Sequence, residues 1–492
     1  MKKSDIGLIG LAVMGENLAL NMESRGFRVS VYNRTVPGIE EGVAERFVAE
    51  KGAGKAFSGF SQMDAFLASL ASPRKIFLMV RAGKPVDELI QQMLPFLDPG
   101  DIVMDGGNSQ FTDTERRVSF LESKGLYFIG AGVSGGEEGA LHGPSIMPGG
   151  SEKAWPLVKP ILQAIAAKAE DGSPCCEWMG KGGAGHFVKT IHNGIEYSDM
   201  QLISEAYSVM KKLFGMPNET IADAFQTWNQ GKLKSYLIEI SAQIMSYKEP
   251  SGEWLIDSIL DTAGQKGTGK WSVSAALDLN IPLGLIATAV FERNLSANKE
   301  ERLTASALYG REASAGIPSG APSDSHSVLQ VESALFASKL VAYAQGFSIL
   351  RQASAEWGWD LNLTAIARIW RSGCIIRSSF LNRIAEAFNN DPELSNLLKA
   401  PWFREEIRAA LPHWKSLVAL ATAHETGTPA FSSALQFFYS FTSETLPANL
   451  IQAQRDYFGA HTYERTDAPR GQYFHTNWTG KGGSTSSGSY NA

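Results

Sequence analysis

Short apolar runs that end in Gly- or Asp-rich turns recur along the N-terminal part of the chain. The runs are DIGLIG, FRVSVYN, KIFLMV, DIVMDGGN, GLYFIGAGVSGG and CCEWMG. Stretches that fit helices separate them, and this alternation is typical of a parallel sheet with crossover helices. We therefore predict an α/β domain of the Rossmann-type, doubly wound kind over residues 1–184.

The pattern changes near Gly185, where the apolar period becomes that of a helix. This period continues to about residue 444 and predicts a large all-α domain over residues 185–444. Within it, the segment from Gly215 to Trp228–Gly231 resembles the segment from Gly358 to Trp370–Gly373. This similarity indicates a possible internal duplication of a helical unit.

Residues 445–492 are predicted to form an extended C-terminal tail. Its last part is rich in Gly, Ser and Thr, a composition for which flexibility is the default. The tail also carries the aromatic side chains of Tyr473, Phe474, Trp478 and Tyr490, which are costly to expose to water. Docking of the tail on another surface is therefore the alternative.

Length, charge and cysteine content limit the kinds of partner. A chain of 492 residues is expected to form two or three domains. A net charge of −6 gives no general attraction to nucleic acid or anionic membranes, and no apolar run is long enough to span a bilayer. Three cysteines without a disulfide or zinc spacing suit a reducing compartment, and the N-terminus shows no transit pattern. We expect a cytoplasmic protein with a small-molecule substrate, no nucleic acid partner and no membrane contact.

A candidate dinucleotide-binding turn follows the first apolar run. Gly10-Leu-Ala12-Val-Met14-Gly15 is a GxAxxG motif, in which Gly10 allows the tight turn and Gly15 permits close packing of a helix on the strand. The positive end of that helix would face a pyrophosphate. Turns of small residues also occur without a nucleotide, so the motif needs its context.

The second run ends at Asn33-Arg34-Thr35, where a dinucleotide-binding fold contacts the ribose. An acidic residue there would bind the 2′-hydroxyl of NAD. Its absence, together with a cation at Arg34 and a hydroxyl at Thr35, suits a 2′-phosphate, so we predict NADP as the cofactor. The alternative is that Arg34 only decorates a surface loop.

Further candidate loops come after later strands. The ranges 79–83 (MVRAG) and 105–109 (DGGNS) follow apolar runs, and ligands of doubly wound sheets bind at the carboxyl ends of strands. The range 132–136 (GVSGG) offers backbone N–H groups and a hydroxyl to a carboxylate. Each range also fits a simple turn. The candidate ligand contacts here are Val80, Arg81, Ala82, Asn108, Ser134, Gly135 and Gly136.

The stretch KTIHNGIEYSDMQLI, residues 189–203, fits a helix with two unlike faces. One face is apolar, and the other carries a base, an imidazole, an amide, an acid and a phenol. Such a mixed set can converge on one small molecule. A solvated helix face with i,i+4 pairs gives the same pattern, so that alternative stays open. The polar residues are Lys189, His192, Asn193, Glu196 and Tyr197.

A loop and a helix in the second half of the chain add positive charge. Lys266 and Thr268 lie among glycines in GQKGTGKW, and Arg293 follows on a predicted helix. A phosphorylated substrate is the simplest use of this charge, although an arginine on a helix is more often in a structural ion pair. Crowding by Lys266 and Arg293, together with partial burial, is expected to favour the neutral form of Lys189. We find no tight metal-ligand spacing and expect no metal.

Six longer motifs stand out: GLAVMG, NRT, GVSGGEEGA, HNGIEYSDMQLI, GQKGTGKW and QAQRDYFGAHTYER. Together they resemble the 6-phosphogluconate dehydrogenase family, and the resemblance runs from residue 6 to the final YNA. It implies an NADP-dependent, decarboxylating oxidoreductase of the pentose phosphate pathway. Such an enzyme converts 6-phospho-D-gluconate into D-ribulose 5-phosphate and CO2 without a metal.

The resemblance also implies roles for individual residues. Lys189 is expected to be the general base that takes the C3 hydroxyl proton, and Glu196 the acid that protonates C1 of the enediol. His192 and Asn193 are expected to hold the sugar acid and assist catalysis. The expected further substrate contacts are Asn108, Ser134, Gly135 and Gly136, and the expected phosphate ligands are Tyr197, Lys266, Thr268 and Arg293.

Members of this family are homodimers in which the C-terminal tail of one subunit threads through its partner. The resemblance therefore implies that Arg455 and His461 reach the site of the other subunit. The chain departs from the usual family pattern at Arg81, Ser198 and Asn294, where Lys, Gly and Cys are common. Arg81 keeps its charge near the cofactor but changes its shape.

Two other functions remain as alternatives. A plain β-hydroxyacid dehydrogenase also has a glycine-rich turn and a helix lysine, but it would not need the KGTGKW loop, the second helical unit or the tail. A non-enzymatic NADP-binding protein would keep Gly10 and Arg34 and lose the base and the acid. The presence of both Lys189 and Glu196 argues against it.

Overall fold

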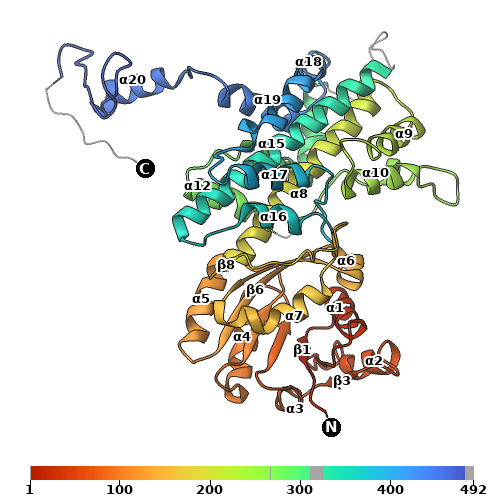
Figure 1. Ribbon diagram of the computed structural model, residues 1–492. Helices are drawn as coiled ribbons and strands as arrows, with labels where there is room; N and C mark the ends of the chain where they lie inside the picture. Colours follow the sequence, from red (N-terminus) through yellow and green to blue (C-terminus); the bar gives the residue numbers. More distant parts are fainter. Residues whose placement is uncertain (1, 266, 311–324, 483–492) are drawn as a thin grey trace. The chain divides into compact units, whose positions relative to one another are not determined.

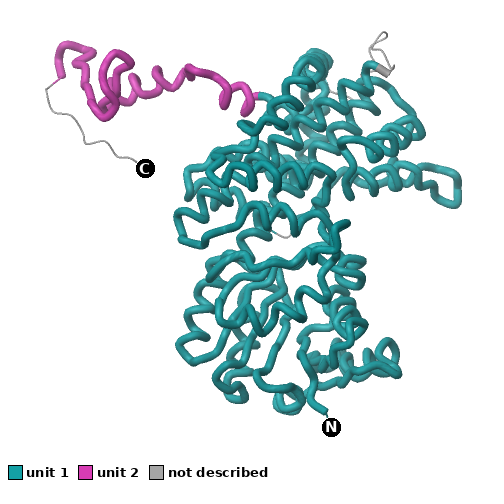
Figure 2. Tube along the Cα trace, viewed as in Figure 1, with its two compact units in different colours: residues 1–435 teal, residues 436–492 magenta. Residues whose placement is uncertain are grey.

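The computed structural model describes residues 2–265, 267–310 and 325–482. The chain forms two compact units, residues 1–435 and residues 436–492 (Figure 2). Among the described residues, no helix combines the length and apolar character that crossing a membrane requires.

One sheet organises the N-terminal part of the first unit. Its strand order is β3-β2-β1-β4-β5-β6-β7-β8. Strands β1 to β6 run parallel, β7 is antiparallel to β6, and β8 is parallel to β7. The strands are β1 (Ile6–Ile9), β2 (Val29–Tyr32), β3 (Phe57–Phe60), β4 (Lys75–Leu78), β5 (Ile102–Asp105), β6 (Tyr127–Ser134), β7 (Ser145–Gly150) and β8 (Gly180–Lys181).

Helices cover both faces of this sheet (Figure 1). Leu18 of α1 and Val158 of α7 belong to the apolar cluster on one face, and Ile90 of α4 and Leu121 of α5 to the cluster on the other. Two covered faces explain why the strands are nearly continuous apolar runs. The helices are α1 (Val13–Ser24), α2 (Val43–Glu50), α3 (Met63–Ala68), α4 (Lys84–Met93), α5 (Phe111–Glu122), α6 (Gly136–His142) and α7 (Trp155–Ile165).

Two strands of this sheet have no counterpart among the apolar runs of the sequence. Strand β3 is the half-buried edge strand FSGF, and β7 is SIMPGG, in which glycines allow close packing on neighbouring backbone. Both lack the long Val- and Ile-rich pattern of a buried parallel strand. Their pairing partners, β2 and β6, determine their place in the sheet.

Helices make up the rest of the first unit, so the predicted order of an α/β domain and a large all-α domain is confirmed. The long helix α8 begins at Ala184 beside the sheet and runs from there into the group of helices (Figure 1). The helices are α8 (Ala184–Ser208), α9 (Asn218–Trp228), α10 (Tyr236–Ser246), α11 (Leu255–Ser258), α12 (Thr268–Asp278), α13 (Gly284–Ala297), α14 (Lys299–Leu308), α15 (Ser325–Trp357), α16 (Leu363–Ile369), α17 (Leu381–Asn390) and α18 (Pro401–Ala423). Helix α19 (Pro429–Phe441) begins in the first unit and ends in the second.

The two segments that resemble each other in sequence have similar structures. Each begins after a long helix, α8 or α15, at a glycine with positive φ, Gly215 or Gly358. Each continues through a short helix to a fully buried tryptophan, Trp228 or Trp370. The chain after each tryptophan then meets the other in an antiparallel bridge between Ser235 and Ser378. This arrangement agrees with the predicted duplication.

The second unit contains helix α20 (Ala448–Gly459) and the chain that folds back on it. The carboxylate of Asp456 is fully buried and contacts four groups of this returning chain. The contacts are Thr462 N (3.0 Å), His475 Nδ1 (2.9 Å), Thr476 N (3.0 Å) and Trp478 Nε1 (2.8 Å). The aromatic side chain of Trp478 is therefore held within this unit by a hydrogen bond.

Candidate active site

The predicted cofactor loops meet at one edge of the sheet. They follow β1, β2, β4 and β5, which are neighbours in the order β2-β1-β4-β5. The strand order reverses between β1 and β4. Strands β2 and β3 lie on one side of β1, and β4 and the later strands lie on the other side. This is the crevice position where doubly wound sheets bind dinucleotides.

The glycine-rich turn after β1 has the close approaches that its sequence predicts. Gly10 has φ +98°, and a Cβ on it would lie 2.5 Å from the carbonyl oxygen of Met79. A Cβ on Gly15 would lie 1.9 Å from the carbonyl oxygen of Gly10. Helix α1 begins at Val13 with Ala12 before it, so its unbonded N–H groups face the turn. The turn fits a pyrophosphate.

The loop after β2 carries Asn33, Arg34 and Thr35. Asn33 accepts a hydrogen bond from Leu11 N at 3.2 Å, which joins this loop to the glycine-rich turn. Arg34 and Thr35 are exposed, and the Arg34 Nε atom lies 3.2 Å from Glu40 Oε2. We call Asn33, Arg34, Thr35 and Glu40 the β2 corner. Sequence reasoning missed Glu40 because only the folding of residues 36–40 returns it to Arg34.

The loop after β5 is shaped by the buried carboxylate of Asp105. This carboxylate accepts hydrogen bonds from Gly107 N at 3.0 Å and Ser109 Oγ at 2.6 Å, which leaves Asn108 exposed between them. The buried guanidinium of Arg117 lies 3.4 Å from Asp105 and donates to Gly83 O at 3.0 Å. Arg117 thus ties the loop of Asn108 to the loop that carries Val80, Arg81 and Ala82.

The polar face of α8 is buried, so the alternative of a solvated face is wrong. Lys189 is only 6% exposed, His192 is fully buried, and the side chain of Glu196 is 21% exposed. Glycines of β6 make room for the helix: a Cβ on Gly132 would lie 2.4 Å from Lys189 Cβ, and one on Gly130 2.7 Å from a ring atom of His186. The sheet and the helical layer therefore enclose this face.

Four side chains of α8 and one of β6 converge there. His192 Nδ1 lies 3.3 Å from Lys189 Nζ, 3.2 Å from Asn193 Oδ1 and 3.7 Å from Glu196 Oε2. His192 Nε2 lies 3.0 Å from Ser134 Oγ. A hydrogen on Nδ1 lets Nε2 accept from Ser134 and lets Nδ1 donate to Asn193 or to an unprotonated lysine. We call Lys189, His192, Asn193 and Glu196 the α8 cluster.

Burial shifts the titration of the α8 cluster. It lowers the pKa of Lys189, although Glu196 and Cys374 act in the opposite direction. It raises the pKa of Glu196, against the attraction of Lys189 and Arg293. The pKa of His192 lies well below its usual range through burial and the charge of Lys189. Burial, and not the predicted crowding by Arg293, is thus the main cause that favours neutral Lys189.

Three of the predicted phosphate ligands lie together beside the α8 cluster. The guanidinium of Arg293 lies over the ring of Tyr197, 3.7 Å from its centroid. Thr268 begins α12, and a Cβ on the next residue, Gly269, would lie 2.7 Å from the Tyr197 ring. Lys266, the fourth predicted ligand, lies outside the described residues.

The predicted carboxylate-binding loop, Ser134-Gly135-Gly136, joins β6 to α6. Gly135 and Gly136 have φ values of +120° and +64°. A Cβ on Gly135 would lie 2.7 Å from the carbonyl oxygen of Gly373, which also accepts from Ser145 N at 2.7 Å. Gly373 supports the loop from the all-α part, a contact that the sequence motif does not predict.

Arg455 and His461 belong to the second unit. Arg455 lies on α20 and donates to Gln452 Oε1 at 3.1 Å. The ring of His461 lies 6.0 Å from that of Phe458. Asp456 lies next to Arg455, and its carboxylate accepts a hydrogen bond from the backbone N–H of Thr462, which follows His461. Asp456 therefore fixes the chain beside both Arg455 and His461.

The three departures from the family pattern have different surroundings. Arg81 is exposed after β4, and Ser198 is buried within α8, where its hydroxyl donates to Gly194 O at 3.3 Å. Asn294 accepts a hydrogen bond from Gln265. None of the three belongs to the α8 cluster or the β2 corner.

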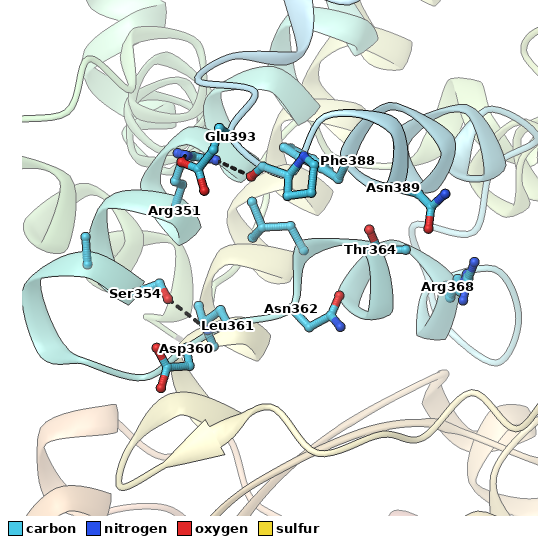
Figure 3. A pocket seen from close by; sticks show the side chains of 13 residues that line it. Arg351, Ser354, Asp360, Leu361, Asn362, Thr364, Arg368, Phe388, Asn389 and Glu393 are labelled. Atoms are coloured by element: carbon cyan, nitrogen blue, oxygen red, sulfur yellow. Dashed lines mark hydrogen bonds and ion pairs between the residues drawn. The ribbon is translucent and has the colours of Figure 1, made fainter.

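A separate pocket of about 610 Å³ lies among α15, α16 and α17 (Figure 3). Its rim includes Arg351, which pairs with Glu393 at 2.6 Å, and Arg368. It contains none of the predicted site residues. Within the described ranges, no group of three or more His, Cys, Asp or Glu side chains has the arrangement of a metal site.

Comparison with known proteins identifies similar families and relatives. The model of the NAD binding domain of 6-phosphogluconate dehydrogenase matches residues 5–180, and that of the 6-phosphogluconate dehydrogenase C-terminal domain matches residues 185–478. The decarboxylating 6-phosphogluconate dehydrogenase of Treponema pallidum is 53% identical over 99% of both chains, and that of Mus musculus is 50% identical over 100% of both.

A solved structure agrees with these matches. It is the Plasmodium falciparum 6-phosphogluconate dehydrogenase, determined without ligand, with its cofactor NADP+ and with its substrate 6-phosphogluconate. It is 43% identical to this chain, covers 96% of it with 100% of its own length, and superposes with a TM-score of 0.91. Similarity thus extends over both the sheet and the helical layer.

Proposed function

The chain belongs to the 6-phosphogluconate dehydrogenase family, and we infer that it oxidises 6-phospho-D-gluconate with NADP, releases CO2 and forms D-ribulose 5-phosphate. The observation that carries this function is the buried α8 cluster, because it places a base and an acid two helical turns apart. Both lie within reach of the same imidazole, His192.

Lys189 is the general base in this proposal. Burial favours its neutral form, which can accept the proton of the C3 hydroxyl as hydride departs. NADP, when bound, supplies the acceptor for that hydride. The protonated Lys189 then lies near the oxygen that becomes an enolate when CO2 leaves, and it stabilises the developing negative charge.

Glu196 is the acid that completes the reaction. Burial raises the pKa of its carboxyl group, so it retains a proton more readily than an exposed glutamate. That proton goes to C1 of the enediol. This is the carbon to which the carboxylate was attached before it left as CO2. His192 and Asn193 orient the sugar acid between the two groups, and Ser134 holds the His192 ring at 3.0 Å.

The remaining contacts divide between the two ends of the substrate and the cofactor. The proposed phosphate ligands are Tyr197, Thr268, Arg293 and Lys266. Arg293 and Tyr197 are in contact, and Thr268 begins α12. The substrate contacts of the sheet are Asn108, Ser134, Gly135 and Gly136. The cofactor contacts are Gly10, Ala12, Met14, Gly15, Asn33, Arg34, Thr35, Val80, Arg81, Ala82 and Asn108.

We propose that the enzyme is a homodimer with exchanged tails. In this arrangement residues 1–184 bind the cofactor, residues 185–444 form the substrate and dimerisation domain, and residues 445–492 dock on the partner. Arg455 and His461 then reach the substrate site of the other subunit. Exposed apolar side chains on α13 and α14 support it, because Phe291 is 62% and Leu308 79% exposed. We also propose the cytoplasm as its compartment, since all three cysteines are buried and unpaired.

Initial rates test the proposed function. The purified enzyme is given 6-phosphogluconate with NADP or NAD in the presence of a chelator, and released CO2 is trapped in parallel. We expect reduction of NADP with one CO2 for each reduced cofactor. Reduction without CO2 would instead assign the chain to the simple β-hydroxyacid dehydrogenases. Binding of NADP without any reduction would leave a non-enzymatic scaffold.

A further inference from the structure

Residues 36–40 form a tight hairpin directly after the predicted 2′-phosphate ligands. Val36 N donates to Glu40 O and Glu40 N donates to Val36 O, both at 2.8 Å. Gly38, at the turn, has φ +75° and donates its N–H to Glu41 Oε1 at 2.8 Å. The paired backbone fixes Glu40 opposite the start of the loop, and its side chain returns to the end of β2.

The carboxylate of Glu40 there contacts the groups that suit a 2′-phosphate. Its Oε2 atom lies 3.2 Å from Arg34 Nε and 3.5 Å from Asn33 Nδ2. The other amide atom of Asn33, Oδ1, accepts from Leu11 N of the glycine-rich turn. Glu40 therefore faces the ribose position, where the sequence alone indicated no acidic residue.

We propose that Glu40 weakens the preference of this enzyme for NADP over NAD by competing with the 2′-phosphate for Arg34. This inference rests on the proposed function, in which Arg34 is a 2′-phosphate ligand. With NADP, the phosphate displaces Glu40 from the guanidinium and lies close to its negative charge. With NAD, the Glu40 carboxylate accepts a hydrogen bond from the ribose 2′-hydroxyl, as acidic residues near this position do in dinucleotide-binding folds.

Exposure of the pair makes this exchange feasible. The side chains of Arg34 and Glu40 are 72% and 37% exposed, and ion pairs in such positions contribute little to stability. A phosphate carries more charge than a carboxylate and offers three acceptor oxygens, so it is the stronger partner for an arginine. Glu40 thus lowers the affinity for NADP without preventing its binding.

Replacement of Glu40 by Gln tests the proposal, with Glu41→Gln as the matched control. The control removes the same charge from the neighbouring residue and keeps an acceptor oxygen for Gly38 N. Binding is measured by calorimetry with adenosine 2′,5′-bisphosphate and with adenosine 5′-phosphate. The ratio of kcat/KM with NADP to kcat/KM with NAD is measured alongside.

We expect Glu40→Gln to bind adenosine 2′,5′-bisphosphate about fivefold more tightly, which is the size of effect that unit charges at such distances produce in water. It should bind adenosine 5′-phosphate somewhat more weakly, because the neutral Gln is a weaker acceptor for the 2′-hydroxyl. The NADP to NAD ratio should rise by at least that factor, and Glu41→Gln should change neither. Unchanged binding of the bisphosphate would overturn the proposal. Weaker binding would also overturn it and would show that Glu40 supports Arg34 as a phosphate ligand.

The two proposals fail in different ways. If the wild-type enzyme reduced no cofactor with 6-phosphogluconate, the proposed function would be lost, but calorimetry would still decide the role of Glu40. If the wild-type enzyme is active and Glu40→Gln behaves like Glu41→Gln, only the role of Glu40 is lost.

Discussion

The α8 cluster and the β2 corner both hold charged side chains at the carboxyl edge of one sheet, but under opposite conditions. In the α8 cluster, the sheet and the helical layer exclude water, and burial is the largest cause of each pKa shift. In the β2 corner, Arg34 is 72% exposed and its partner Glu40 is held by a surface hairpin. Burial at one site prepares chemistry, and exposure at the other allows exchange between ligands.

The difference predicts where each region acts on the kinetics. In the proposed mechanism, groups of the α8 cluster act on the reacting carbons, so their removal should lower kcat. Groups of the β2 corner are proposed to contact only the adenosine end of the cofactor, so their removal should change cofactor affinity. The comparison would be wrong if variants of the α8 cluster changed only cofactor affinity, or if variants of the β2 corner lowered kcat.

Lys189→Met is expected to have the largest effect. It retains the apolar stem against Gly132 and removes the proposed general base, so kcat should fall by about 10³-fold or more. Affinity for adenosine 2′,5′-bisphosphate should remain unchanged, because the β2 corner is intact. Single-turnover measurements with NADP report the loss in the chemical step.

A matched lysine separates catalysis from general charge effects. Lys212, in the turn that follows α8, is exposed, and Lys212→Met should retain wild-type kcat. If Lys189→Met kept more than about a tenth of the wild-type rate, another group would be the base, since general base catalysis contributes 10²-fold or more.

The pH dependence of the α8 cluster gives the second prediction. Neutral Lys189 is needed as base, so the rate should rise as the pH passes its lowered pKa. Protonated Glu196 is needed as acid, so the rate should fall as the pH passes its raised pKa. The result is a bell-shaped profile of kcat/KM whose two limbs belong to the coupled pair.

Glu196→Gln should change this profile in a defined direction. On the acidic limb Glu196 is protonated and uncharged, so its replacement by the neutral Gln should leave that limb in place or move it slightly to higher pH. The alkaline limb should disappear and kcat should fall by about 10²-fold. An alkaline limb that persists in Glu196→Gln would contradict the assignment of Glu196 to that limb.

Much of the fold and of the cofactor site could be predicted from local sequence patterns. Apolar runs placed β1, β2, β4, β5 and β6, because strands covered on both faces are nearly continuously apolar. The turn at Gly10 and Gly15 was predictable because both glycines meet backbone atoms too closely for a side chain. The edge strand β3 and the glycine-rich β7 were not, since their positions depend on strand pairing.

Burial of the α8 face could not be read from its sequence. The same alternation of polar and apolar residues suits a helix in water, and the decision depends on Gly130 and Gly132, which lie far away in the sequence. Glu40 was missed for a related reason, because a hairpin brings it back to Arg34. In both cases, contacts between separate segments set the environment of a residue that the sequence had singled out.

Salt is expected to have the smallest effect and to separate the two regions most simply. Exposed charges are screened within about 10 Å at 0.1 M salt, whereas buried groups are screened much less. Raising the salt concentration from about 0.05 M to about 0.5 M should therefore raise KM for NADP about threefold relative to KM for NAD. Both cofactors share the pyrophosphate, so their ratio isolates the 2′-phosphate.

The value of kcat at saturating substrate is the internal control in this series. It depends on the α8 cluster, where the side chain of Lys189 is 6% exposed, and it should change by less than about twofold over the same salt range. Steady-state rates with each cofactor measure both quantities in one experiment. A parallel fall of kcat would mean that mobile ions reach the α8 cluster, and burial would then no longer explain its shifted titration.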